Sequence, residues 1–181
     1  APAGTYTLTA TASNGCTSSA SASVTINAQP QTPAVPTIAV QVTQPTCAIA
    51  TGSFNVSNYD ANVTYTITPN TGVTMSNTGV VTAPAGTYTL TATASNGCTS
   101  SASASVTIDA QPETPAVPTI AAQVTQPTCA VATGSFTVSN YDASMTYTIT
   151  PNSGVSMSNT GVVTAPAGTY TLTATASNGC T

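Results

Sequence analysis

The sequence predicts an all-β protein made of tandem antiparallel β-sandwich domains. Apolar residues alternate with Thr and Ser at a period of two, which is typical of strands with one buried face. No stretch shows the 3.6-residue period of an amphipathic helix. The sequence also repeats itself every 82 residues, and a repeat of this kind indicates an array of similar folded modules.

The repeat predicts the domain organisation. Residues 1–6 recur at 83–88 and at 165–170, and only nine of the 99 comparable positions differ. Closely spaced prolines, which favour an extended and semi-rigid backbone, interrupt the pattern twice. We therefore expect the C-terminal part of one repeat (1–28), a linker (29–36), a complete repeat domain (37–110), a second linker (111–118) and a truncated repeat domain (119–181).

The complete repeat is expected to hold about seven strands. The clearest, residues 87–94, places Tyr88, Leu90 and Ala92 on one face and threonines on the other. Seven short strands in one small domain favour a two-sheet sandwich of the immunoglobulin-like type. The others are expected at 37–43, with Val40 inward, at 53–57, 63–67, 73–75 and 79–82, and at 98–108, with Ala102 and Ala104 inward.

Two local motifs predict backbone geometry. A three-residue loop, Ser95-Asn96-Gly97, would pair Ala94 with Cys98 and place Gly97 in the left-handed region. Gly86-Thr87-Tyr88 is similar to a tyrosine corner, in which the phenol bonds back to the backbone a few residues upstream.

The five cysteines predict structural disulfides. We expect Cys47 to pair with Cys98, and Cys129 with Cys180, each closing a loop of about 50 residues within one domain. A bond between Cys98 and Cys129 across the linker is an alternative that the sequence leaves open. We expect Cys16 to pair with a cysteine outside this sequence. Paired cysteines in small β domains are typical of an oxidising, extracellular location.

The composition excludes most kinds of chemistry. The chain has no Lys, Arg or His, and its only acids are Asp60, Asp109, Glu113 and Asp142. Nucleic acid is a poor partner without basic side chains, and no apolar run is long enough to insert into a membrane. No general base stands ready to activate the Ser, Thr or Cys side chains, and the carboxylates are too few for a calcium cage. We expect no enzymatic activity, no cofactor and no metal.

The segment around Tyr59 and Asp60 is the candidate binding site, together with its repeat at Tyr141 and Asp142. Exposed tyrosines beside a carboxylate could hold a glycan. The favoured interpretation is structural: each Asp bonds its own backbone in a turn, and each Tyr covers one end of the core.

Residues 46–54 (TCAIATGSF) and 85–99 (AGTYTLTATASNGCT) carry a family resemblance. They resemble the Cys-containing immunoglobulin-like repeats of large Bacteroidota cell-surface adhesins, of the gliding-motility adhesin type. The resemblance implies export by the type IX route and display on the cell surface.

Near-identical tandem copies give a protein length or multivalency rather than catalysis. The sequence therefore predicts a structural segment of an extracellular adhesin or filament, acting as a rigid, disulfide-stabilised stalk or fibre. Its expected partners are neighbouring repeats or like chains in a fibre. The alternative is a multivalent module that binds glycans or another surface.

Overall fold

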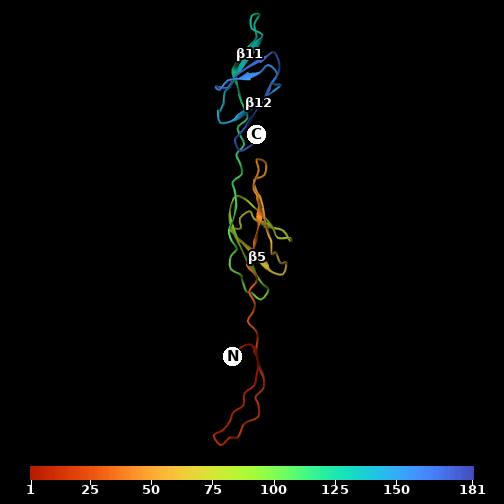
Figure 1. The fold of residues 1–181 in the computed structure, drawn as a ribbon, viewed down its shortest axis with the longest axis vertical. Helices are drawn as coiled ribbons and strands as arrows, with labels where there is room; N and C mark the ends of the chain where they lie inside the picture. The colour runs from red at the N-terminus through yellow and green to blue at the C-terminus, as the bar shows by residue number, and fades with distance from the viewer. The chain divides into compact units, whose positions relative to one another are not determined.

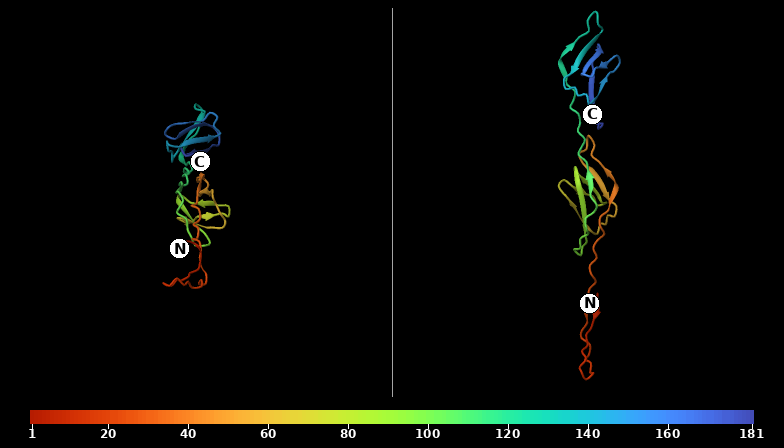
Figure 2. Two further views of the ribbon diagram at one scale, coloured as in Figure 1. Left: turned by 60° about the horizontal axis from the view of Figure 1, so that its bottom comes forward. Right: turned by 60° about the vertical axis from the view of Figure 1, so that its left-hand side comes forward.

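A computed structural model describes all 181 residues of the chain (Figure 1). It contains fifteen strands and no helix, which confirms the predicted all-β class. The strands form antiparallel sheets, consistent with a β-sandwich (Figure 2). Since every element is a strand, the chain has no helix that could cross a membrane.

The chain forms two compact units. The first comprises residues 1–42, 54–82 and 87–107, and the second comprises residues 43–53, 83–86 and 108–181. The second unit thus includes the loop 43–53 from the first complete repeat. The domain limits expected from the sequence remain predictions.

The first complete repeat has seven strands, the number expected. They pair as a four-stranded sheet in the order β3-β4-β7-β6 and a three-stranded sheet in the order β5-β8-β9. The buried side chains include Phe54, Val81, Tyr88 and Leu90, each 2% exposed or less. The strands are β3 (Ile38–Thr43), β4 (Gly52–Val56), β5 (Thr64–Thr68), β6 (Thr74–Met75), β7 (Val80–Ala83), β8 (Gly86–Thr93) and β9 (Val106–Ile108).

The second repeat has the same arrangement. One sheet has the order β10-β11-β14-β13, and β12 pairs with β15 in the other. A two-stranded sheet of β1 (Gly4–Tyr6) and β2 (Val24–Ile26) lies in residues 1–28. The strands of the second repeat are β10 (Ile120–Thr125), β11 (Thr133–Val138), β12 (Thr146–Thr150), β13 (Ser156–Met157), β14 (Val162–Pro166) and β15 (Thr171–Thr175).

The expected inward position of Val40 is wrong. Val40 is fully exposed, although its neighbours Ile38 and Val42 are partly buried. In the second repeat the register between β10 and β11 shifts between Ile120 and Val124. β10 advances four residues from Ile120 to Val124, whereas β11 advances only two, from Val138 to Phe136. The extra residues bulge out of the ladder, so a side chain midway between two that share a face is exposed and simple alternation fails there.

The expected strand at residues 98–108 is also wrong over most of its length. Only β9 is a strand, Ala102 and Ala104 are exposed, and Ser100 and Ser103 are buried instead. Ser103 Oγ accepts a hydrogen bond from Leu90 N (3.0 Å), and Ser100 Oγ accepts one from Ala92 N (3.0 Å). Serine side chains therefore take the place of backbone carbonyls along β8, and the burial period becomes three rather than two.

The three-residue loop is confirmed, and the tyrosine corner is found in the copies of the motif at residues 4–6 and 168–170. Ala94 N donates to Cys98 O (2.9 Å) across a three-residue loop, and Gly97 has a φ of 82°. In two copies of the tyrosine corner the phenol donates to the backbone four residues upstream, Tyr6 to Pro2 O (2.7 Å) and Tyr170 to Pro166 O (2.9 Å).

Candidate functional site

A disulfide joins Cys47 of the first complete repeat to Cys180 of the second. The two Cα atoms are 5.5 Å apart, and 133 residues separate the cysteines in sequence. Both belong to the second compact unit. Cys180 is completely buried. We call this bond and the residues around it the junction.

Each cysteine of the junction is held by local backbone structure. Cys47 lies in a tight loop closed by hydrogen bonds from Thr46 N to Ile49 O (2.9 Å) and from Ile49 N to Thr46 O (3.2 Å). Cys180 lies at the end of the Asn-Gly-Cys turn, where its N–H donates to Asn178 Oδ1 (2.9 Å). The two sulfur atoms are therefore presented by ordered turns.

The linker lies beside these two turns and is hydrogen-bonded to both. Gln111 Nε2 donates to Cys47 O (3.0 Å), and Asn178 Nδ2 donates to Glu113 O (3.0 Å). Between them, Pro112 O lies 3.9 Å from Cys180 Sγ. Hydrogen bonds hold the linker on both sides of the disulfide, so it is a docked segment and not a free spacer.

The far end of each linker is docked as well. In the first repeat Asn58 donates through Nδ2 to Val35 O (2.8 Å) and accepts through Oδ1 from Thr37 N (2.8 Å). In the second repeat Asn140 makes the same pair of bonds to Val117 and Thr119. One amide side chain thus bonds both the end of the linker and the first residue of the repeat that follows it.

The expected pairings of Cys47 with Cys98 and of Cys129 with Cys180 are wrong. Cys98 and Cys129 are free thiols, as is Cys16, so the alternative bond between Cys98 and Cys129 does not form either. The reason lies in the direction of the strands.

β10 and β14 are both antiparallel to β11, so they run in the same direction. The loop with Cys129 follows β10, whereas the turn with Cys180 follows β15, which runs back after β14. The two cysteines therefore lie at opposite ends of one sandwich. Five residues of strand span about 17 Å, and the Cα atoms of a disulfide cannot be more than about 7 Å apart.

The candidate binding residues are engaged within the fold. The rings of Tyr59 and Tyr65 stack with centroids 5.4 Å apart, and those of Tyr141 and Tyr147 at 5.2 Å. Asp60 Oδ1 accepts hydrogen bonds from Asn62 N (2.9 Å) and Asn62 Nδ2 (2.8 Å). These contacts confirm the turn and account for the carboxylate and the ring without a ligand.

Asp142 has the corresponding turn with a different partner. Its Oδ1 accepts from Ser144 N (2.8 Å) and from Ser144 Oγ (2.7 Å). These two bonds, the backbone one foremost, stabilise the charged form and hold the pKa of Asp142 below its usual value. No group of three or more Cys, Asp or Glu side chains is close enough together to bind a metal ion.

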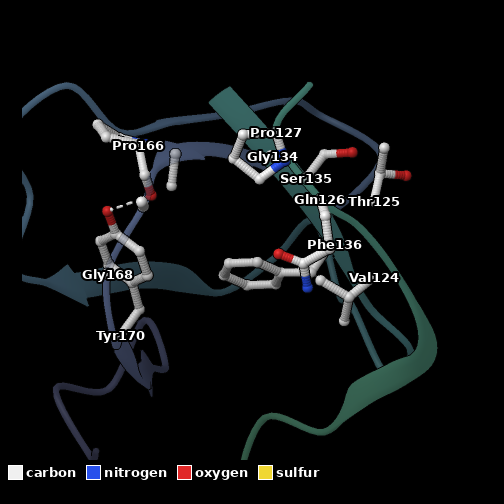
Figure 3. A pocket seen from close by; sticks show the side chains of 12 residues that line it. Val124, Thr125, Gln126, Pro127, Gly134, Ser135, Phe136, Pro166, Gly168 and Tyr170 are labelled. Carbon is white, nitrogen blue, oxygen red and sulfur yellow. Dashed lines mark hydrogen bonds between the residues drawn. The ribbon is translucent and has the colours of Figure 1, made fainter. Parts of the chain in front are cut away.

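One cavity of about 200 Å³ lies beside Phe136 and Tyr170 (Figure 3). Phe136 points into it, and Gly134 lies on its wall. In the first repeat the equivalent glycine is Gly52, and a Cβ there would lie 2.8 Å from Ile108 Cγ2. The cavity thus lies where the first repeat holds the side chain of Ile108.

Sequence reasoning missed the residues that dock the linker, Gln111, Asn178 and Asn58. It also missed the correct partner of Cys47. A signal for the partner was present: five predicted strands separate Cys47 from Cys98, and an odd number of up-and-down strands brings the chain to the opposite end. No protein-family model matches the chain, and no curated protein matches it.

Proposed function

We propose that this chain is a structural segment of an extracellular bacterial surface adhesin or filament, in which tandem sandwiches form a rigid stalk or fibre. The observation that carries the proposal is the junction, because a disulfide between successive repeats adds a second covalent connection to the linker. A docked linker with a parallel covalent bond resists both bending and extension.

Three further features support this function. The two repeats are nearly identical, so the array gains length without gaining new chemistry. The intramolecular disulfide is compatible with an oxidising location outside the cell. The family resemblance of residues 46–54 and 85–99 is to surface adhesins of Bacteroidota, which the type IX route exports.

Electron microscopy of cells that produce the protein tests the proposal, with antibodies against the chain as the label. We expect label along continuous fibres that project from the surface, with an axial repeat of about 35–45 Å for one small sandwich and its linker. Label confined to the cell interior would overturn the proposal, and so would flexible chains of separate beads. In the latter case a glycan screen would test the multivalent binding module.

A further inference from the structure

The bond between Cys47 and Cys180 has a simple meaning in terms of the repeat. Each repeat has a first cysteine in the loop after its first strand and a second in its Asn-Gly-Cys turn. Cys47 is the first cysteine of one repeat, and Cys180 is the second cysteine of the next. The bond therefore connects neighbouring repeats in a defined direction, first cysteine to following second cysteine.

The turn around Cys98 has the same construction as the turn around Cys180. Cys98 N donates to Asn96 Oδ1 (2.9 Å), and Asn96 Nδ2 donates to Gln31 O (3.0 Å). Cys98 Sγ lies 3.9 Å from Pro30 O, as Cys180 Sγ lies 3.9 Å from Pro112 O. Cys98, although partly exposed, thus has the same turn and linker contacts as the bonded Cys180.

The loop around Cys129 likewise repeats the loop around Cys47. Thr128 N donates to Val131 O (2.8 Å) and Val131 N to Thr128 O (3.3 Å), the pair of bonds found between Thr46 and Ile49. Cys129 at this loop is exposed. One half of a junction is therefore present at each of these two free thiols.

We propose that this bond recurs at every junction of a longer array. Cys129 bonds the second cysteine of the following repeat, and Cys98 bonds the first cysteine of the preceding one. Cys16, a second cysteine, bonds the first cysteine of the repeat before its own. The three free thiols are those for which this rule places the partner outside the 181 residues.

Each bond forms by thiol–disulfide exchange. A thiolate from one cysteine attacks a small-molecule disulfide, such as oxidised glutathione, and forms a mixed disulfide with release of one reduced thiol. The second cysteine attacks that mixed disulfide and releases the second reduced thiol. Two thiol protons and two electrons leave the protein, and the small-molecule disulfide is reduced by the same two electrons.

The recurring bond has a mechanical consequence. Successive disulfide loops overlap, so every peptide bond of the array, including those of the linkers, is bypassed by at least one disulfide. The shortest covalent path along the array crosses the disulfide from Cys47 to Cys180. It then follows the backbone to the first cysteine of the next repeat. This backbone stretch is as long as the one from Cys98 to Cys129, which is 31 residues. Two repeats then extend to about 110 Å at most, against about 570 Å for the unbonded backbone.

The test is a chain extended by one repeat, with residues 100–181 appended after Thr181 to give seven cysteines. The native and extended chains are refolded with reduced and oxidised glutathione, the remaining thiols are alkylated, and mass spectrometry counts cysteines outside protein disulfides. If the junction bond recurs, three cysteines remain outside disulfides in both chains. If cysteines pair within domains, or if Cys98 bonds Cys129, one cysteine remains outside disulfides in both chains. Any count other than three in the extended chain overturns the proposal.

Two variants of the extended chain provide a matched pair. Cys129→Ala removes a cysteine that is bonded under the proposal, so four cysteines remain outside disulfides. Cys98→Ala removes one that is free, so two remain. Equal counts for the two variants would contradict the recurring bond, and because only connectivity is counted, the result is independent of whether the array is a stalk.

A Glu-specific protease gives a second readout on the extended chain. Glu113 is the only glutamate of the native chain and lies in the linker, so the appended repeat adds one site, in an equivalent linker. After cleavage under denaturing, non-reducing conditions the three pieces stay together, and reduction separates them. Pieces that separate before reduction would overturn the proposal.

Discussion

Removal of single cysteines distinguishes the observed junction from bonds within each domain. Cys47→Ala breaks the disulfide and leaves Cys180 free, whereas Cys98→Ala removes a thiol that is already free. We therefore expect the first variant to lose stability and the second to lose almost none. Bonds within domains would make the two variants equally unstable, because Cys47 and Cys98 would then be partners.

The expected loss follows from the size of the loop. The disulfide spans 133 residues, and the chain-entropy relation assigns a loop of this length about 5 kcal/mol of stabilisation against the unfolded chain. Measured values for disulfides are typically about 2–4 kcal/mol. Cys180→Ala should cost somewhat more than Cys47→Ala, because Cys180 is completely buried and its truncation also leaves a small cavity.

The assay is equilibrium unfolding in guanidinium chloride, followed by far-UV circular dichroism. The wild-type chain in reductant serves as a reference and should match Cys47→Ala. The variants Cys98→Ala and Cys129→Ala should lie within about 0.5 kcal/mol of the oxidised wild type. A loss for Cys98→Ala equal to that for Cys47→Ala would refute the junction.

Three further predictions follow from individual contacts. Ser103→Ala should lower the free energy of unfolding in urea by about 1–3 kcal/mol, because the buried N–H of Leu90 loses its acceptor. The control Ser21→Ala removes the same bond at an exposed site and should lower it by less than about 0.5 kcal/mol. Equal losses for the two variants would contradict this explanation. The pKa of Asp142 is lower in the folded protein, so its carboxylate should stabilise the fold above the unfolded pKa of about 3.9. This stabilisation should be lost as the pH falls through the folded pKa. Ser144→Ala should raise the folded pKa in an NMR titration, and an unchanged value would exclude the serine as the cause. Under force applied at both ends, reduction should lengthen the chain by about 460 Å, because the disulfide withholds 133 residues; about 350 Å would instead indicate two loops of 51 residues.

Much of the fold was predictable because it depends on local rules. Alternation of Tyr88, Leu90 and Ala92 predicted the position of β8 to within a residue. The Asn-Gly pair predicted the turn, since Gly97 adopts the left-handed backbone that a three-residue loop requires. Such signals lie within a few residues of one another, and no distant partner is needed to interpret them.

Burial was less predictable because it depends on distant partners. Leu8 and Leu90 lie in identical segments, yet Leu8 is 70% exposed and Leu90 is 1% exposed. The difference comes from the second sheet, which packs against one copy and is not beside the other. Likewise, a serine gave no indication that it would accept a bond from a β8 amide, because alternation predicted an outward Ser103.

The disulfide was mispredicted because proximity in the sequence was taken as proximity in space. Within one repeat, β10 and β15 run in opposite directions and carry their cysteines to opposite ends. A disulfide partner for either cysteine must then lie outside its own sandwich. The same strand-direction argument that forbids a bond inside the sandwich thus favours one across the junction.

A disulfide across the junction also restricts bending between successive repeats, which a disulfide inside one sandwich would not affect. A disulfide within a domain would stabilise that domain and leave its linker as the only covalent connection to the next. The observed bond and the linker instead form two connections at one junction, with Gln111 and Asn178 bonding the linker on either side of the sulfur atoms. Rotation about a single connection is restricted when a second lies beside it, so resistance to bending increases. The chain has no Lys, Arg or His, so no side-chain salt bridge can connect its repeats, and the disulfide and the hydrogen bonds of the linker are the specific contacts found at the junction.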